Sequence, residues 1–454
     1  MIKTLLIANR GEIALRIVRA ARELGIRSIV AHSSADAETL AVQLADDAIE
    51  IGPPQASKSY LNAEALIDAA RQYQVDAIHP GYGFLSENAD FADAVHRAGI
   101  IFVGPSGDII RRMGDKAAAR RTAKAAGVPV VPGSEGEVPS VEQACRLAEE
   151  IGYPIMIKAS AGGGGRGIRI AGNREALMKQ MPTAQTEARA AFGHGGVYLE
   201  RFIPQARHIE VQILGDGEHV VHLFERECSL QRRRQKLIEE SPSPALDEAT
   251  RAELCESAVT LARHIGYSGA GTLEYLFDEH RREFFFIEMN TRIQVEHPVT
   301  EQITGIDLIR EMLLIADGKP LSLQQSHIHR SGAAIELRLN AEDPDQDFRP
   351  SLGTIETLRW PSGPGIRIES GLYPGYRIPP FYDAMLAKLV IWDQDRPAAL
   401  ARARRALDEL ILEGVTTTAS LHVRLLADPH VRDGNVHNQF LEQWLEHYQQ
   451  EVSA

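Results

Sequence analysis

Polar and charged side chains alternate along one short segment in the second half of the chain. Glu288 and Asn290 end an apolar run, and Arg292, Gln294 and Glu296 continue at every second position. Since successive side chains of a strand point to opposite faces, we expect all five on one face of one extended segment. Carboxylate and amide oxygens suit Mg²⁺, an arginine can hold a small oxyanion, and a glutamate can accept its proton. The segment therefore predicts a site for chemistry on an oxyanion; a solvent-facing polar strand is the alternative.

A glycine-rich loop earlier in the chain predicts a phosphate site. Residues 161–167 read AGGGGRG, and backbone amides without a neighbouring Cβ can approach phosphate oxygens closely. Lys158 stands just before the loop in an apolar stretch and would supply a positive charge. A flexible hairpin would explain the glycines alone, but apolar strands on both sides favour a phosphate-binding loop.

Two further features are candidates for the same chemistry. Glu274 is enclosed in the apolar strand GTLEYLF, where an unpaired carboxylate is costly to bury. The segment 231–236 reads QRRRQK and is strongly basic. A basic run of this kind can bind anions, and it can equally be a solvated loop.

The first 110 residues alternate between strand-like and helix-like stretches. Amphipathic helices are expected up to Gly25 and over 65–74. Apolar strands are expected at 4–8, 28–34, 76–80 and 100–105. This alternation predicts a parallel sheet covered by helices. The first strand turns into NRGE, which lacks the glycine pattern of dinucleotide-binding folds, so no dinucleotide site is predicted.

The rest of the chain divides at its turn residues. Residues 115–127 are helical by propensity. The glycine loop lies between short strands, which predicts an inserted mobile lobe over 130–203. From 204 onward longer strands predict an antiparallel sheet, and 395–448 is mainly helical. The long strands are expected at 208–216, 219–227, 269–278, 283–290 and 333–342.

The composition limits the classes of function. The 454 residues are 44% hydrophobic and 24% charged, which fits a globular protein of several domains. A net charge of −13 argues against a nucleic-acid partner. Three cysteines are too few for a disulfide framework and fit a reducing compartment. No apolar window suits a membrane span or a signal peptide, so we expect a cytoplasmic protein without a membrane partner.

Five motifs, in order along the chain, resemble the biotin carboxylase family. A glycine loop alone would be a weak signal, but five motifs in the family's order are specific, and the similarity runs from about residue 2 to 445. The motifs are HPGYGFLSEN (79–88), MGDK (113–116), KASAGGGGRG (158–167), EMNTRIQVEHPVTE (288–301) and NAEDP (340–344).

The resemblance implies an ATP-grasp fold of mixed α/β and α+β class. Such a fold combines a parallel-sheet domain, a mobile glycine-rich lid and a C-terminal antiparallel-sheet domain. The expected divisions are an N-terminal α/β domain (1–113), a linker helix (114–129), the lid (130–203), a metal and bicarbonate subdomain (204–330) and a C-terminal domain (331–448).

The resemblance also implies a two-step ligase reaction. ATP phosphorylates bicarbonate to carboxyphosphate, and the carboxyl group then passes to N1 of biotin. The expected cofactors are ATP, Mg²⁺ or Mn²⁺, and biotin held on a separate biotin carboxyl carrier protein, with bicarbonate as substrate. The chain carries no biotin-accepting motif and no carboxyltransferase region, so we expect both on separate partner chains. A second copy of this chain is expected as a further partner.

Positions that match the family's motifs take the corresponding expected roles. Glu296 would deprotonate bicarbonate, and Arg338 would stabilise the enolate-like oxygen of biotin, whose ring Tyr82 would help to place. The residues expected to be catalytic are Arg292, Glu296, Lys236 and Arg338. The residues expected to bind bicarbonate are Lys236, Arg292, Gln294 and the Val295 backbone.

The remaining expected roles concern the metal and the nucleotide. The metal ligands would be Glu274, Glu288 and Asn290. The residues expected to bind ATP are Lys116, Lys158, Gly164, Gly165, Glu200, Arg201, Phe202, Ile203, His208, Glu274 and Glu288.

One departure from the family pattern stands out, and Arg201, where lysine is common, is a milder one. The family usually reads QRRHQK where this chain reads QRRRQK, so Arg234 replaces a histidine near the nucleotide. Arginine donates hydrogen bonds but cannot accept one. We therefore expect an altered affinity for ATP with catalysis retained.

Other functions are compatible with parts of the pattern. Another ATP-grasp carboxylate ligase would not explain RIQVE and HPGYGFLSEN, and a catalytically silent ATP-binding paralogue should lack the base or an arginine. The final acceptor stays open. Acetyl-CoA, and with it fatty-acid synthesis, is the expected choice, with propionyl-CoA, methylcrotonyl-CoA, pyruvate and urea as alternatives.

Overall fold

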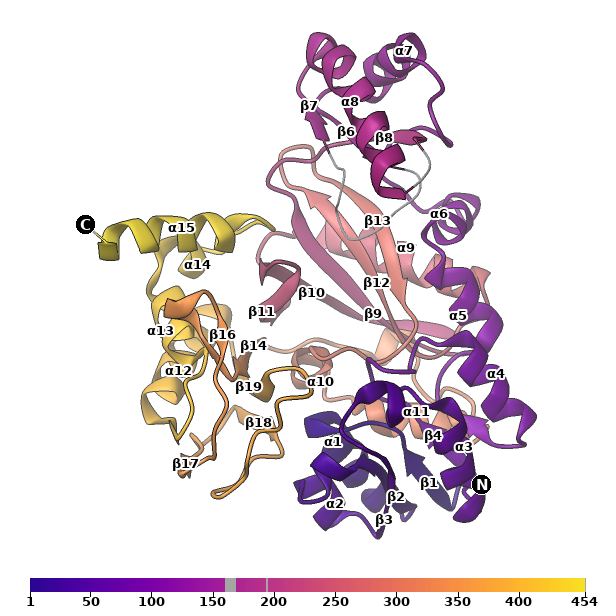
Figure 1. Cartoon of the computed structure of the whole chain (residues 1–454), viewed down its shortest axis with the longest axis vertical. Helices are drawn as coiled ribbons and strands as arrows, with labels where there is room; N and C mark the ends of the chain where they lie inside the picture. Colours follow the sequence, from indigo (N-terminus) through magenta and orange to yellow (C-terminus); the bar gives the residue numbers. More distant parts are fainter. Residues whose placement is uncertain (160–168, 193–194, 454) are drawn as a thin grey trace.

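The computed structural model describes residues 1–159, 169–192 and 195–453 (Figure 1). Gly164 and Gly165, the predicted lid glycines, lie outside the described residues. Figure 1 shows a long central sheet, with the N-terminal domain in indigo below it, a small lobe at the top and the C-terminal helices in yellow at one side. None of the described helices is long and apolar enough to cross a membrane.

A parallel sheet forms the N-terminal part of the chain, as the alternating pattern predicts. Its strand order is β3-β2-β1-β4-β5, and every neighbouring pair is parallel. Leu5 and Ile7 pack into the core on one face, while Leu6 packs into the core on the other. The strands are β1 (Thr4–Ile7), β2 (Arg27–Ser33), β3 (Asp47–Gly52), β4 (Ala77–His79) and β5 (Ile101–Phe102).

Helices cover both faces of this sheet. The core on one face includes Ile13 of α1 and Leu308 of α11, and the core on the other includes Leu66 of α3 and Phe91 of α4. A segment distant in sequence therefore closes the N-terminal domain. The covering helices are α1 (Gly11–Glu23), α2 (Leu40–Leu44), α3 (Ala63–Gln72), α4 (Ala89–Arg97) and α11 (Leu308–Ala316). Helix α5 (Gly107–Gly114) follows β5 and packs through Met113 into a different core, against the central sheet.

The small lobe contains a three-stranded antiparallel sheet in the order β7-β6-β8. Strands β6 (Ile155–Ala159) and β7 (Arg169–Ala171) lie on either side of the glycine-rich segment, as predicted, and β8 (Val197–Arg201) completes the sheet. The lobe also carries two helices that the sequence analysis did not predict, α7 (Val141–Ile151) and α8 (Arg174–Phe192). Cys145 and Leu177 pack these helices onto the strands in one apolar core.

The central sheet has eight strands in the order β13-β12-β9-β10-β11-β14-β19-β18. All of its neighbouring pairs are antiparallel, and β11 pairs with β14, so the sheet continues across the predicted division at 330/331. Its strands are β9 (Arg207–Asp216), β10 (Val220–Arg232), β11 (Gln235–Ser241), β12 (Ser268–Asp278), β13 (Glu283–Asn290), β14 (Ala333–Asn340), β18 (Ile366–Ser370) and β19 (Met385–Asp393).

The prediction of one extended segment from Glu288 to Glu296 is wrong. Strand β13 ends at Asn290, and residues 291–296 form an irregular turn before α10 (His297–Thr304). Pro298 lies in the first turn of that helix, where its fixed φ favours helix initiation. The chain therefore leaves the sheet, and the polar side chains reach the site from a turn instead of from one strand face.

The remaining elements surround the central sheet. Within the predicted helical end, 411–413 forms a short strand that pairs with β17. The remaining helices are α6 (Lys116–Ala125), α9 (Glu248–His264), α12 (Arg396–Glu409), α13 (Ala419–Ala427), α14 (Pro429–Arg432) and α15 (Phe440–Ser453). The short strands are β15 (Glu342–Asp343), β16 (Arg349–Pro350), β17 (Thr357–Arg359) and β20 (Ile411–Glu413).

Candidate active site

Charged side chains form a row across four strands of the central sheet. Arg226 lies opposite Glu210, Glu210 opposite Glu274, and Glu274 opposite Glu288. Opposite residues of antiparallel strands present their side chains on the same face, about 5 Å apart at Cβ. Arg226 and Glu210 are fully buried, and such charges persist in an interior only when they are paired.

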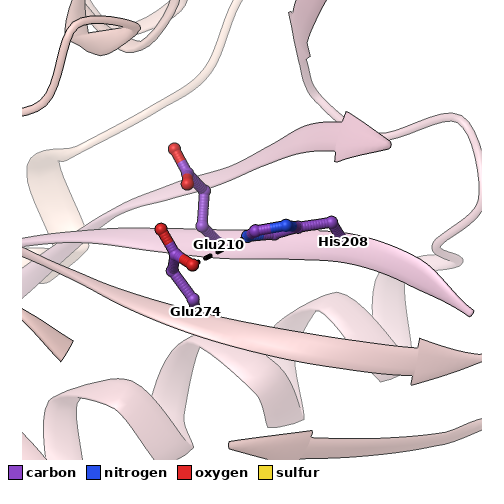
Figure 2. A group of neighbouring side chains, drawn as sticks. All are labelled: His208, Glu210 and Glu274. Atoms are coloured by element: carbon purple, nitrogen blue, oxygen red, sulfur yellow. Dashed lines mark ion pairs between the residues drawn. The ribbon is translucent and has the colours of Figure 1, made fainter. Parts of the chain in front are cut away.

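Figure 2 shows three members of this cluster, with the side chains of Glu210 and Glu274 rising from neighbouring strands beside the ring of His208. His208 Nε2 lies 3.0 Å from Glu274 Oε2. Burial opposes a charged imidazole, but the adjacent carboxylates, Glu274 foremost, raise the pKa of His208 above its ordinary value. The same burial opposes the Glu274 carboxylate, and Lys236 and His208 outweigh it, so the pKa of Glu274 is far below its ordinary value.

Lys236 is the centre of the cluster. Its Nζ atom lies 2.6 Å from Glu210 Oε2, 2.5 Å from Glu296 Oε1 and 3.4 Å from Glu274 Oε1. Burial opposes the ammonium charge, but the anionic surroundings raise the pKa of Lys236 well above its ordinary value. The lysine therefore stays charged and forms ion pairs with acids from three different segments.

Arg226 holds the turn that carries the predicted oxyanion residues. Its guanidinium donates to Gln294 Oε1 at 3.0 Å, to Thr300 Oγ1 at 2.9 Å and to Glu210 Oε1 at 2.5 Å. Gln294 in turn donates from Nε2 to Glu274 Oε1 at 3.0 Å. The turn is thus fixed to the sheet by side-chain hydrogen bonds, and not as part of the extended segment that the sequence predicts.

Glu296 lies between two cations. Lys236 contacts one carboxylate oxygen, and Arg338 Nη2 donates to the other at 3.0 Å. Burial opposes the carboxylate, but Lys236 and Arg338 hold the pKa of Glu296 well below its ordinary value. The predicted base and the predicted biotin-side arginine are therefore in direct contact.

A second pair of acids lies behind Arg338. Arg338 Nε donates to Glu239 Oε1 at 2.7 Å, and Glu239 lies opposite Glu336 in the sheet. Burial raises the pKa of Glu239 to about 7, although Arg338 opposes this shift. Burial also raises the pKa of Glu336 well above its ordinary value, and neither of its oxygens has a hydrogen-bond partner among the described residues. Burial therefore disfavours the ionised form of both carboxyl groups, and Arg338 favours the ionised form of Glu239.

The predicted metal ligands lie together at one end of the row. Glu274 and Glu288 are opposite one another on β12 and β13, and Asn290 Nδ2 donates to Glu274 Oε1 at 2.8 Å. Hard oxygen ligands from two adjacent carboxylates fit Mg²⁺, which keeps the rest of its shell for water and phosphate oxygens. Glu288 Oε2 is 2.8 Å from Lys116 Nζ, so a predicted phosphate-binding lysine lies beside this site.

Arg292 is anchored by a residue of the first long motif. Its Nε donates to Glu87 Oε2 at 2.8 Å, and its Nη2 donates to Asn290 Oδ1 at 3.0 Å. Glu87 Oε1 also accepts the backbone N–H of Thr291 at 3.1 Å. The motif at 79–88 therefore acts as a support for the turn, a role that no pattern in the motif itself predicts.

The predicted nucleotide residues of the lobe form a second group. Lys158 and Glu200 form an ion pair, and Glu200 also accepts from Arg120 Nη1 at 3.2 Å. Arg201 Nη2 lies 2.6 Å from Glu283 Oε2 on β13 and so ties the lobe to the central sheet. The other two predicted residues of this group are in the connection from β8 to β9: the Phe202 N–H donates to Pro154 O at 2.9 Å, and Ile203 is buried against Val131 and Phe285.

Tyr82 reaches the site from the N-terminal domain. Its hydroxyl donates to Glu12 Oε1, and burial, with Glu12 next in effect, raises the pKa of Tyr82 well above its ordinary value. It therefore stays a neutral donor.

The backbone carbonyl of Val295 accepts from Lys388 Nζ at 2.8 Å, so this predicted bicarbonate residue is also fixed by a distant strand.

Several residues of the site were missed from the sequence. Glu210 alternates with apolar neighbours in HIEVQIL, which is a usable signal of a buried charge, and Glu239 lies in a similar apolar strand. The residues that sequence reasoning did not single out are Glu12, Glu87, Glu210, Arg226, Glu239, Glu336 and Lys388. Together with the predicted groups they bring the carboxylate of Glu296, the ammonium of Lys236 and the guanidinium of Arg338 into direct contact, beside the paired carboxylates Glu274 and Glu288.

Three family models match the chain. Residues 1–110 match the biotin carboxylase N-terminal domain, 115–324 the carbamoyl-phosphate synthase L chain ATP binding domain, and 336–443 the biotin carboxylase C-terminal domain. Among curated proteins, Biotin carboxylase 1 of Bacillus subtilis (strain 168) is 52% identical over 97% of this chain and 98% of its own length. A pyruvate carboxylase subunit of Methanothermobacter thermautotrophicus is 46% identical over 98% of this chain and 90% of its own length.

A solved structure is similar over the same extent. It is the biotin carboxylase domain dimer of the Hydrogenobacter thermophilus 2-oxoglutarate carboxylase, in complex with MgADP, ADP and bicarbonate. The TM-score is 0.87 and the identity 47%, with 98% of each chain covered.

Proposed function

The chain belongs to the biotin carboxylase family, whose members are ATP-grasp ligases, and from that premise we propose that it carboxylates N1 of biotin with ATP and bicarbonate. One observation carries the proposal. Glu296 contacts Lys236 on one side and Arg338 on the other, so a base lies between an anion-binding lysine and a biotin-side arginine.

In the first step, the chain binds and activates bicarbonate. Lys236, Arg292, Gln294 and the Val295 N–H would bind the anion, and Glu296 would accept its proton. An anion that draws the Lys236 ammonium away from Glu296 removes the nearer of the two cations that depress its basicity. Substrate binding thus makes this carboxylate a stronger base at the moment when it is needed.

The same step requires a neutralised γ-phosphate. The deprotonated bicarbonate oxygen attacks the γ-phosphorus, the bond to the β-phosphate oxygen breaks, and ADP leaves. Lys116 and Lys158 would contact the phosphates, with Gly164 and Gly165 covering them and His208 at the nucleotide. Glu200, Arg201, Phe202 and Ile203 would contact the adenine. Glu274 and Glu288 would hold Mg²⁺, with Asn290 beside them. The ion supplies charge neutralisation to the transferring phosphoryl group.

In the second step, the chain protects carboxyphosphate and holds biotin. Carboxyphosphate is short-lived in water, so a closed site has a clear purpose. The bond between the carboxyl carbon and the phosphate oxygen would break, phosphate would leave with the N1 proton, and the carboxyl group would bond to N1. Arg338 would stabilise the oxygen of the biotin ring as N1 loses that proton, and Tyr82 would place the ring. Arg338 is already oriented by Glu239 and Glu296, so little reorganisation is required.

The remaining assignments are part of the same proposal. The chain divides into the segments 1–113, 114–129, 130–203, 204–330 and 331–448. Its partners are a biotin carboxyl carrier protein, a carboxyltransferase and a second copy of itself, in the cytoplasm, where ATP and bicarbonate are supplied. The similar structure from Hydrogenobacter thermophilus is a dimer, which supports the last partner.

Acetyl-CoA is the proposed final acceptor. The support is that the curated relative from Bacillus subtilis is named Biotin carboxylase 1, without another acceptor in its name, and matches this chain over nearly its full length. Two relatives are named for pyruvate carboxylase and 2-oxoglutarate carboxylase, so pyruvate and 2-oxoglutarate are the alternative acceptors. Assays with each carboxyltransferase would distinguish them.

The experiment is bicarbonate-dependent release of ADP, with and without free biotin, for wild type and Arg338→Ala. Biotin should raise the wild-type rate of ADP release. In the variant, the biotin-dependent part of the rate should be about a hundredfold lower. Binding of ATP without turnover in bicarbonate and biotin, even with the carrier protein added, would instead indicate a silent paralogue.

A further inference from the structure

A fully buried lysine of the C-terminal segment lies where three distant parts of the chain meet. Lys388 is on β19, and its neighbours across the sheet are Arg338 on β14 and Glu369 on β18. It therefore lies in the same row as the proposed biotin-side arginine. A buried lysine needs partners, and its contacts lead out of its own sheet.

Those contacts join the two sides of the site. Lys388 Nζ lies 3.0 Å from Glu12 Oε1 on α1 and donates to the Val295 carbonyl at 2.8 Å. Glu12 Oε1 is also the atom that accepts from the Tyr82 hydroxyl. The other oxygen, Glu12 Oε2, has no hydrogen-bond partner in the described part of the chain. One carboxylate oxygen is thus shared by Lys388 and Tyr82.

The two contacts of Lys388 fix residues of two different proposed subsites. Holding the Val295 carbonyl fixes the peptide unit that joins Val295 to Glu296, and therefore the backbone that carries the bicarbonate N–H and the base. Holding Glu12 fixes the acceptor of Tyr82, on the biotin side. Glu12 and Val295 are far apart in the sequence, and Lys388 contacts both, so it fixes the position of the turn relative to Tyr82.

We propose that Lys388 is a positioning residue that couples the bicarbonate subsite to the biotin subsite, with Glu12 as its link to Tyr82. The inference rests on the proposed function and deepens it. Lys388 touches no reacting atom; it acts through Val295 on one side and through Glu12 on the other.

Variants at the two positions should separate the subsites. Lys388→Met keeps the length of the side chain and removes both contacts, so the KM for bicarbonate and the KM for biotin should each rise about tenfold, the effect of losing one charged hydrogen bond. Glu12→Gln leaves the Val295 contact, so only the KM for biotin should rise. The KM for ATP should stay within about twofold in both variants.

A matched control tests whether any lost buried cation has this effect. Arg251 is also buried and lies 2.8 Å from Glu225, but it contacts neither the turn nor Tyr82. Arg251→Met should lower thermal stability and leave both KM values unchanged. If Arg251→Met raises both KM values as Lys388→Met does, or if Lys388→Met raises neither KM, the positioning role is overturned.

Two further measurements keep the test decisive. If Lys388→Met alone does not fold, the neutral pair Lys388→Met with Glu12→Gln removes the uncompensated charge and should still raise both KM values. Lys388→Arg, which keeps a donor, should restore at least part of the bicarbonate KM. Wild type is assayed first: absence of bicarbonate-dependent ADP release there would overturn the proposed function, whereas normal wild-type turnover with unchanged variants would overturn only the role of Lys388.

Discussion

Glu296 shows how the surroundings of a single carboxylate determine its chemistry. Lys236 Nζ at 2.5 Å and Arg338 Nη2 at 3.0 Å hold it ionised at a depth where an isolated carboxylate would be protonated. Its pKa is accordingly far below the ordinary value, and the residue is a weak base until one cation is drawn away. The pH dependence of the reaction should therefore change when the ammonium group of Lys236 is removed.

Replacing Lys236 with glutamine should change both the rate and the pH profile. Glu296 must be deprotonated to act as a base, and removal of the ammonium group lets its pKa rise. In wild type the acidic limb of kcat/KM for bicarbonate lies below the assayed range, because the pKa of Glu296 is well below its ordinary value. In the glutamine variant this limb should move up into the assayed range, with the maximal rate about a hundredfold lower. The measurement is bicarbonate-dependent ADP release over pH 5–9.

The control for this profile is Lys236→Arg, which keeps a cation beside Glu296. Its acidic limb should stay near the wild-type position even if its rate falls. A glutamine variant with the wild-type limb would show that Lys236 does not set the basicity of Glu296.

At the level of single residues, the sequence identified groups with recognisable spacing and missed those that only folding brings together. Glu296, Arg292 and Lys236 lie in motifs, whereas Glu12 and Glu87 contact the site from segments more than 200 residues away. No local pattern marks such a residue, because its role depends on a partner that the fold supplies.

The hairpin joining β10 and β11 carries Arg234, the main departure from the family pattern. Arg233 and Arg234 form its two-residue turn, with φ values of 47° and 68°. Both residues occupy the left-handed region, which arginine adopts at some cost. The turn lies between the Arg232–Asp347 ion pair and Lys236, so it exposes Arg234 close to the site.

We expect Arg234→His to lower the KM for ATP by about three- to tenfold, because histidine can accept a hydrogen bond that arginine cannot. The value of kcat at saturating ATP should stay within about twofold, since Lys236 and Glu296 are unchanged. Arg233→His is the matched control: it alters the same turn in the same way and should leave the KM for ATP unchanged. Equal effects of both substitutions would attribute the change to the turn and not to a nucleotide contact.

At the level of elements, long periodic patterns predicted well and short irregular segments did not. Strands β1, β2, β4 and β5 of the parallel sheet and β9, β10, β12 and β13 of the central sheet occur where alternation and apolar runs place them, whereas β3 was not predicted. The turn at 291–296 has the period of a strand, yet Pro298 starts a helix and Arg226 holds the turn from the side. Tertiary hydrogen bonds therefore decided a conformation that periodicity alone assigned wrongly.

Over the whole molecule, the central sheet joins segments that the sequence suggests are separate domains. Strands β11 and β14 pair across the predicted division at 330/331, and Lys388 links α1 to the turn before α10. The C-terminal segment is joined in the same way, because Arg207 on β9 donates to the Gly434 carbonyl at 2.6 Å. We therefore expect buried charges at these junctions to influence the stability of the whole chain.

Glu227 is such a charge, and its stability effect has a definite sign. It is buried on β10, accepts from Ser243 Oγ at 2.7 Å and lies 3.8 Å from Arg207. Burial raises the pKa of Glu227 to about 7, with Arg207 and the two neighbouring serines only partly offsetting it. An unfolded glutamate has a pKa of about 4.3, so the folded state holds the proton more tightly. This contribution to stability is complete below about pH 4 and is lost as the pH rises to about 7.

Glu227→Gln removes this titration, so the advantage of the variant over wild type should grow with pH. The free energy of unfolding of the variant minus that of wild type should be larger at pH 8 than at pH 5, by on the order of 1–3 kcal/mol. The variant is thus relatively more stable at pH 8. Urea unfolding of both proteins at the two pH values measures the difference. Glu253→Gln, on the exposed face of α9, is the control and should shift by the same amount at both pH values. A Glu227→Gln difference that is constant from pH 5 to pH 8 would mean that the carboxyl group is already ionised at pH 5, and that Arg207 and the serines outweigh the cost of its burial.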